Sequence, residues 1–181
     1  MSEGIDLPRV SRGTVLDEAA RAARLDLAAP QILAAVRDER DPIVVQATLA
    51  ALLWEALPQA SWVGFYRRVG PSTLAVGPYQ GPMGCLYIDF ARGVCGACAR
   101  TRTAQLVPDV REFPGHIACD DATLSELVLP VLDGRGIVQA VLDLDSHTLA
   151  AFSPGEQFRL ERLVRAAFHA SIAWPATAST P

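Results

Sequence analysis

The chain has 181 residues, of which 50% are hydrophobic, and a formal net charge of −4 at neutral pH. That apolar content is enough for one domain with a hydrophobic core, and without a basic run a nucleic-acid partner is not expected. The sequence has neither a signal-peptide core nor an uncharged apolar stretch of about 18 residues, so we expect a cytoplasmic protein that does not contact a membrane. It contains no lysine and no asparagine, which excludes a P-loop, lysine Schiff-base chemistry and a Cys-His-Asn triad.

Two helices are predicted in the first third of the chain. The first begins with Thr14 as its cap and continues to about Leu27. The second begins at Asp41-Pro42, a cap followed by proline at the first helical position, and Pro58 ends it. The intervening segment, residues 30–41, is expected to be helical in part.

From Ser61 onward the pattern is typical of strands, rich in aromatic and β-branched residues. Strands are predicted over residues 61–69, 73–80, 85–90, 105–110, 125–132 and 137–144. A short helix is predicted over residues 93–101. A capping box, Ser153-Pro154-Gly155-Glu156, begins a terminal helix that is expected to reach Ala173.

Helices at both ends of a mainly antiparallel sheet predict an α+β fold. The expected organisation is an N-terminal extension over residues 1–13, a single domain over residues 14–174 and a disordered tail over residues 175–181.

The chain has four cysteines, and all of them lie within residues 85–119. In a cytoplasmic protein, clustered cysteines indicate metal binding or catalysis. Cys95-x-x-Cys98 is half of a structural zinc site, with His116 as a further ligand, but no second close pair completes it. The same C-x-x-C, at the start of a predicted helix, matches a thioredoxin-type dithiol, although no βαβ strand precedes it. The alternative is that Cys98 packs as a small apolar residue.

A third interpretation places redox chemistry at Cys119, in a loop between predicted strands, where reactive groups are commonly found. Asp143 and Asp145 are two residues apart on a strand, so both project from the same face. Together with Glu126 they form a group of carboxylates in which crowding raises a pKa and keeps a proton available. The alternative from the pattern alone is a solvated strand end with two surface acids.

Several motifs between residues 61 and 146 occur in order and with compatible spacing. They are Trp62-Val63-Gly64-Phe65-Tyr66, Gly77-Pro78-Tyr79-Gln80-Gly81, Cys85, Gly93-Val94-Cys95-Gly96, Val107-Pro108-Asp109-Val110, Phe113-Pro114-Gly115-His116-Ile117-Ala118-Cys119-Asp120, Ser125-Glu126 and Leu142-Asp143-Leu144-Asp145-Ser146. In these motifs the chain resembles the free methionine-R-sulfoxide reductases, which are single-domain GAF proteins. The block that contains Cys119 is the most specific of them. The resemblance implies a GAF domain with a six-stranded antiparallel sheet flanked by N- and C-terminal helices, and reduction of the R epimer of free methionine sulfoxide.

The resemblance also implies roles for the thiols. Cys119 would be the attacking thiolate, Cys85 the resolving thiol and Cys95 a third, ancillary cysteine. The reaction would pass through a sulfenic acid on Cys119 and a disulfide with Cys85. Cys98 departs from the family pattern; its thiol would either form an off-pathway disulfide with Cys95 or serve as a second resolving thiol.

For the substrate site, the resemblance implies that Glu126, Asp143 and Asp145 hold the sulfoxide and that one of them supplies a proton. Trp62 and Tyr66, four residues apart on one strand face, would form a wall against the methyl group. The alternative interpretation of Trp62 and Tyr66 is that they are ordinary core residues. His116 would lie in the substrate site, where it either steadies the loop or, as a cation, lowers the pKa of Cys119.

The family needs no bound cofactor or metal, so the implied reductant is external, a thioredoxin system driven by NADPH. The family also tends to form homodimers, for which the N-terminal helices are candidate contacts. The main alternative function is a GAF sensor module that binds a small molecule without catalysis.

Overall fold

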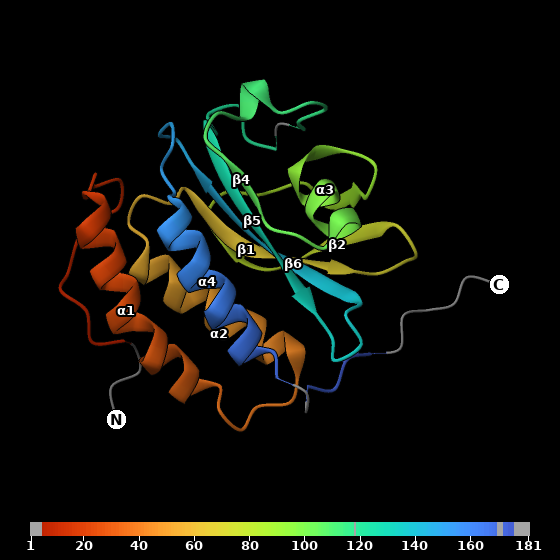
Figure 1. Cartoon of the computed structure of the whole chain (residues 1–181), viewed down its shortest axis with the longest axis horizontal. Coiled ribbons are helices and arrows are strands. Elements are labelled where there is room, and N and C mark those ends of the chain that lie inside the picture. The colour runs from red at the N-terminus through yellow and green to blue at the C-terminus, as the bar shows by residue number, and fades with distance from the viewer. Residues whose placement is uncertain (1–4, 118, 170–171, 176–181) are drawn as a thin grey trace.

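The computed structural model describes residues 5–117, 119–169 and 172–175, which form a sheet with helices on both faces (Figure 1). The sheet has six antiparallel strands in the order β3-β2-β1-β6-β5-β4. The strands are β1 (Trp62–Arg68), β2 (Thr73–Gln80), β3 (Tyr87–Asp89), β4 (Gln105–Val107), β5 (Ser125–Leu132) and β6 (Val138–Ser146). The predicted α+β fold with a six-stranded antiparallel sheet is therefore confirmed.

Three helices cover one face of the sheet, and a shorter one covers the other (Figure 1). The three are α1 (Glu18–Ala35), α2 (Pro42–Ala56) and α4 (Pro154–Ala167), and the shorter one is α3 (Gly93–Thr101). A short 3₁₀ helix, η1 (Val110–Glu112), follows β4. No helix in the described ranges is both long enough and apolar enough to cross a bilayer.

Strand alternation divides the apolar side chains between two cores. On β1, Val63 and Phe65 face the core under α1, α2 and α4. Trp62 and Tyr66, on the same strand, face the smaller core under α3. The acids Glu126 and Asp143 are buried on the side of the smaller core, because the central strands β5 and β6 place them on that face.

The first helix differs from its prediction at both ends. Asp17, not Thr14, is the N-cap, and its carboxylate accepts from the backbone N–H of Ala20. The helix continues through Pro30 to Ala35 instead of ending near Leu27. Its buried positions, Leu25, Ala28 and Ile32, form one continuous face across the proline. The free energy gained by packing that face exceeds the cost of the backbone hydrogen bond that Pro30 removes.

Four other elements also differ from the sequence prediction in their bounds. The predicted strand 85–90 is reduced to β3, so Cys85 lies in the connection before it. The predicted strand 105–110 ends at Val107, because Pro108 cannot donate to the ladder. The last strand, β6, extends to Ser146 instead of ending at 144, so both Asp143 and Asp145 lie inside it. The terminal helix, α4, ends at Ala167, six residues before the predicted end. The helix predicted over 93–101 and the strand over 125–132 are confirmed.

The predicted domain bounds remain a prediction. Ile5 and Leu7, within the predicted extension, pack against the larger core. Of the predicted tail, residues 176–181 lie outside the described residues.

Glu156, at the start of α4, connects three elements of the larger core. Its side chain is fully buried and forms an ion pair with Arg21 of α1 at 3.0 Å. It also accepts from Gln59 Nε2 at 3.0 Å and, as part of the capping box, from the backbone N–H of Ser153 at 3.0 Å.

Glu156→Ala should lower the free energy of unfolding by about 3 kcal/mol, because it removes the capping box and leaves the Arg21 guanidinium without its partner. Urea denaturation measures this change. Glu55→Ala, at an exposed helical position on α2, is the matched control and should cost less than about 0.5 kcal/mol. Equal losses in the two variants would show that the buried ion pair contributes nothing.

Candidate active site

Three acids lie side by side on the α3 face of the sheet because of strand register. Asp145 of β6 pairs with Trp62 on one side and with Glu126 of β5 on the other. Asp143, two residues earlier on β6, pairs with Gly64. Because residues directly opposite each other in a sheet point to the same face, this register brings the acids and the aromatic ring together. The prediction that Asp143 and Asp145 share a face is confirmed.

These acids line a small cavity of about 40 Å³ beneath the loops on the α3 side. Burial raises the pKa of Glu126 well above its ordinary value, and the charges of Asp143 and Asp145 raise it further. Burial likewise raises the pKa of Asp145 well above its usual range. For Asp143, burial raises the pKa from 3.8 to about 6. Burial therefore favours the protonated form of all three carboxyl groups.

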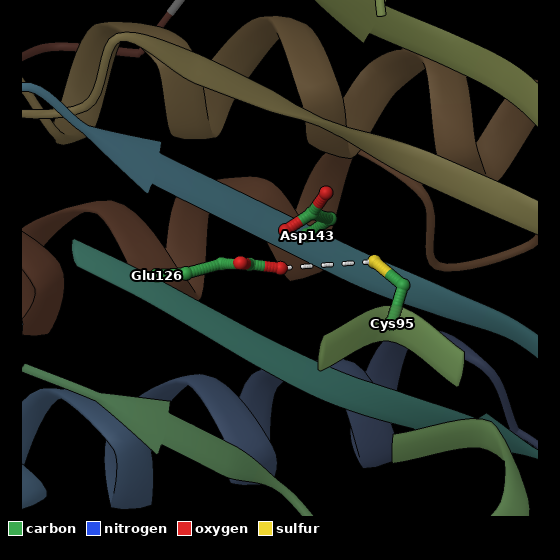
Figure 2. Close-up of side chains that lie close together, drawn as sticks. All are labelled: Cys95, Glu126 and Asp143. Carbon is green, nitrogen blue, oxygen red and sulfur yellow. Dashed lines mark hydrogen bonds between the residues drawn. The ribbon is translucent and has the colours of Figure 1, made fainter. Parts of the chain in front are cut away.

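Cys95 reaches the same place from the opposite layer. Figure 2 shows its side chain pointing from α3 toward Glu126 and Asp143 on the sheet. The thiol donates to Glu126 Oε1 at a sulfur–oxygen distance of 3.9 Å. Burial, followed by the negative charges of Asp143 and Glu126, raises the pKa of Cys95 well above its ordinary value. Cys95 is therefore a protonated hydrogen-bond donor at neutral pH and not a thiolate.

A disulfide joins Cys85 and Cys119, with a Cα–Cα distance of 5.4 Å. Cys119 lies on the loop before β5 and lines the cavity, yet it is exposed to solvent. Cys85 lies in the connection between β2 and β3 and is half-buried. The other two cysteines, Cys95 and Cys98, are free and buried. The structure thus separates the four cysteines into an oxidised pair at the surface and a reduced pair inside.

An aromatic stack forms one wall of the cavity. The ring of Trp62 stacks on Tyr66 at 5.6 Å and on Tyr79 at 5.2 Å between centroids. Its Nε1 donates to the carbonyl of Pro82 at 3.0 Å. The stack lies flat over β1 because Gly64 has no side chain: a Cβ there would lie 2.3 Å from Tyr79 Cβ and 2.5 Å from the Trp62 ring.

His116 lies at the cavity, with its Nε2 3.8 Å from Glu126 Oε2, which is too long for a hydrogen bond. Burial lowers the pKa of His116, so the neutral imidazole is favoured at pH 7. This disfavours the predicted cationic role, and the role of steadying the loop stays a prediction. A second histidine, His147, contacts Asp120 Oδ2 at 2.9 Å and so ties the loop that bears Cys119 to the end of β6.

Among the described residues, the ligand atoms of Cys95, Glu126 and Asp143 lie within 4.8 Å of one another and form the one group close enough to share a metal ion. One thiol and two carboxylates are not a usual zinc set, which has two or more thiolates or imidazoles. Of the zinc ligands considered from the sequence, only Cys95 belongs to this group; Cys98 and His116 do not.

Most of the residues predicted for the site meet at this cavity. Its lining includes Trp62, Tyr66, Cys95, His116, Cys119, Glu126, Asp143 and Asp145. Cys85 joins them through its disulfide. Sequence reasoning assigned no role to Pro82, Met83 and Gly84, which also line the cavity, or to Tyr79 in the aromatic stack. Their closeness in sequence to Cys85 was the available signal.

The fold and this site define a GAF domain with a disulfide beside its cavity. A solved structure described as the GAF domain superposes with a TM-score of 0.78 at 30% identity, over 86% of this chain and 91% of the other. The free methionine-R-sulfoxide reductase of Neisseria meningitidis, solved in complex with its substrate, also gives 0.78, at 36% identity, over 89% of this chain and 94% of the other. No family model matches the chain.

The curated free methionine-R-sulfoxide reductase of Escherichia coli K12 is 42% identical over 118 residues, which cover 65% of this chain and 70% of that protein. The chain belongs to the free methionine-R-sulfoxide reductase family.

Gly64→Ala should lower the free energy of unfolding by about 1–3 kcal/mol, since the new methyl group overpacks the aromatic stack. Thermal unfolding measures the loss. Gly134→Ala, in a hairpin where a Cβ would have no neighbour within 4 Å, is the matched control and should change stability by less than about 0.5 kcal/mol. If the two variants are equally stable, the stack does not depend on Gly64.

The buried acids should also make stability depend on pH. The pKa of Asp143 rises to about 6 on folding. The stabilisation that comes from its preference for the protonated form is therefore fully present below its unfolded pKa of 3.8 and is lost as pH rises through 6. The free energy of unfolding of Asp143→Asn minus that of the parent protein should therefore be larger at pH 7.5 than at pH 4, by about 1 kcal/mol or more. Urea denaturation of the oxidised protein at both pH values tests this, with the exposed Asp121→Asn as control. A difference independent of pH would contradict it.

Proposed function

We propose that this protein reduces free L-methionine-(R)-sulfoxide to methionine, with Cys119 as nucleophile and Cys85 as resolving thiol. The observation that carries the proposal is the Cys85–Cys119 disulfide beside a cavity lined with buried acids whose pKa values are raised. The relatives named for this activity support the same reaction.

In the proposed reaction the Cys119 thiolate attacks the sulfoxide sulfur while a buried carboxylic acid protonates the departing oxygen. In the resulting adduct the hydroxyl group is transferred from the substrate sulfur to Cys119 Sγ. The substrate sulfur–oxygen bond and the new sulfur–sulfur bond both break, so methionine leaves, reduced by two electrons, and Cys119 is left as a sulfenic acid. The Cys85 thiol then attacks this sulfenic sulfur, releasing water and forming the disulfide. Glu126 and Asp145 are the proposed acids, because burial raises both pKa values well above the usual range.

We propose a different role for Asp143, in binding the substrate. Its Oδ1 is buried and has no hydrogen-bond partner within the described part of the chain. A buried acceptor of this kind is satisfied by a donor on a ligand, such as the ammonium group of a free amino acid. This supports a free amino acid over a methionine sulfoxide inside a polypeptide, which has no ammonium there. Trp62 and Tyr66 would contact the methyl end.

Turnover requires an external reductant, for which we propose a thioredoxin-like dithiol supplied with electrons by NADPH. A cytoplasmic location is proposed with it, since reducing compartments keep cysteines such as Cys95 and Cys98 free. A homodimer is also proposed, because members of the family tend to form homodimers.

The activity is tested with dithiothreitol as reductant, by measuring methionine released from each epimer of free methionine sulfoxide. The R epimer should turn over and the S epimer should not. Cys119→Ser should lower kcat at least about 1,000-fold, and Glu126→Gln about 100-fold or more. Cys98→Ala is the matched cysteine control, outside the cavity lining, and should retain most of the activity.

Equal turnover of both epimers, or full activity in Cys119→Ser, would contradict the proposal. Thermal stabilisation by a cyclic nucleotide, with no turnover of either epimer, would instead favour a sensor module.

A further inference from the structure

The disulfide is open to attack from outside, and the remaining thiols cannot reduce it from within. Cys119 is exposed and Cys85 half-buried, whereas Cys95 is 4% and Cys98 0% exposed. Burial raises the pKa of both inner thiols well above the neutral range, so neither is a nucleophilic thiolate at pH 7. The two electrons that reopen the disulfide therefore come from another molecule.

Two large apolar side chains lie exposed immediately after Cys85. Leu86 is 54% and Tyr87 70% exposed. Tyr87 begins β3, the edge strand of the sheet, whose outer side has no strand partner in the part of the chain that the structure describes. Exposed apolar residues beside an unpaired strand edge are a common feature of protein interaction sites.

We propose that Leu86, Tyr87 and the free edge of β3 form the docking surface for a protein dithiol reductant. This inference rests on the proposed function, since it concerns how the same disulfide is reopened. We refer to these three features as the reductant surface.

The reaction at this surface is a thiol–disulfide exchange. One thiolate of the reductant attacks Sγ of Cys85, so a new sulfur–sulfur bond forms to Cys85 and the Cys85–Cys119 bond breaks. Cys119 leaves as the thiolate needed for the next turnover. The second thiol of the reductant then displaces Cys85, so the reductant is oxidised to a disulfide and both cysteines are reduced. Attack at Cys85 follows from the position of the apolar side chains, which are its sequence neighbours.

The size of the surface favours a transient redox partner over a second copy of the chain. Specific stable interfaces bury about 1,200–2,000 Å², whereas electron-transfer encounters fall at the low end of the range. A patch centred on two side chains next to the reacting sulfur is suited to an encounter that must dissociate at every turnover.

The double variant Leu86→Ser/Tyr87→Thr tests the surface, because neither residue lines the substrate cavity. Turnover of free methionine sulfoxide is measured with two reductants: a bacterial thioredoxin with its reductase and NADPH, and dithiothreitol alone. We expect kcat/KM for thioredoxin to fall about tenfold or more, as is usual for loss of central interface anchors. The dithiothreitol-driven rate should stay within about twofold of the parent protein, since a small thiol needs no docking surface.

The matched control is Leu27→Ser/Phe158→Ser, on α1 and α4 across the sheet, where the two side chains are 53% and 59% exposed. It should leave both rates unchanged. A thioredoxin mutant with a single active-site cysteine should be trapped on the oxidised parent protein at Cys85, as shown by peptide mapping.

Unchanged kcat/KM for thioredoxin in the double variant, or trapping at Cys119, would overturn the inference. So would a parent protein that is dimeric by light scattering and becomes monomeric in the double variant, which would assign the surface to a second copy. If the parent protein shows no turnover with dithiothreitol, it is the proposed function that fails and not the docking surface.

Discussion

The burial of three carboxyl groups on one face of a sheet is the constraint on which the rest of the structure depends. The register of β1, β5 and β6 places Glu126 and Asp145 directly opposite each other and Asp143 two residues away. Desolvation raises the pKa of all three acids, and neighbouring carboxylates raise those of Glu126 and Asp145 further, so keeping these groups buried has a cost in stability. Hydrophobic burial in the larger core on the opposite face, under α1, α2 and α4, offsets the free-energy cost of burying these acids.

The same burial divides four chemically identical thiols into two kinds. Cys95 faces the acids from α3, and their negative charge adds to desolvation in keeping it protonated (Figure 2). Cys85, which is half-buried, and Cys119, which is exposed, lie on connections outside the sheet and form the disulfide. Reactivity is therefore assigned by position in the fold. The C-x-x-C pair is the most conspicuous feature of the sequence, but its two thiols are the least able to start the chemistry.

Local signals in the sequence predicted most of the fold. The capping box of α4, the α3 helix and β5 are where the sequence places them, because caps, turns and alternation act over a few residues. α1 continues through Pro30 because of packing against distant elements, which no local rule detects. For the site, period-two alternation placed both aspartates on one face. The flat position of Trp62 over Gly64 and the late end of β6 depend on strand pairing and could not be read from single segments.

The central claim is that Cys119 and Cys85 form the redox pair while the inner thiols remain reduced. A single turnover tests it most directly: fully reduced protein is mixed with one equivalent of free L-methionine-(R)-sulfoxide, without reductant, and its disulfides are mapped by mass spectrometry. The account predicts one equivalent of methionine, a Cys85–Cys119 disulfide, and free Cys95 and Cys98. A Cys95–Cys98 disulfide formed with the same yield of methionine, while Cys119 stays reduced, would contradict it.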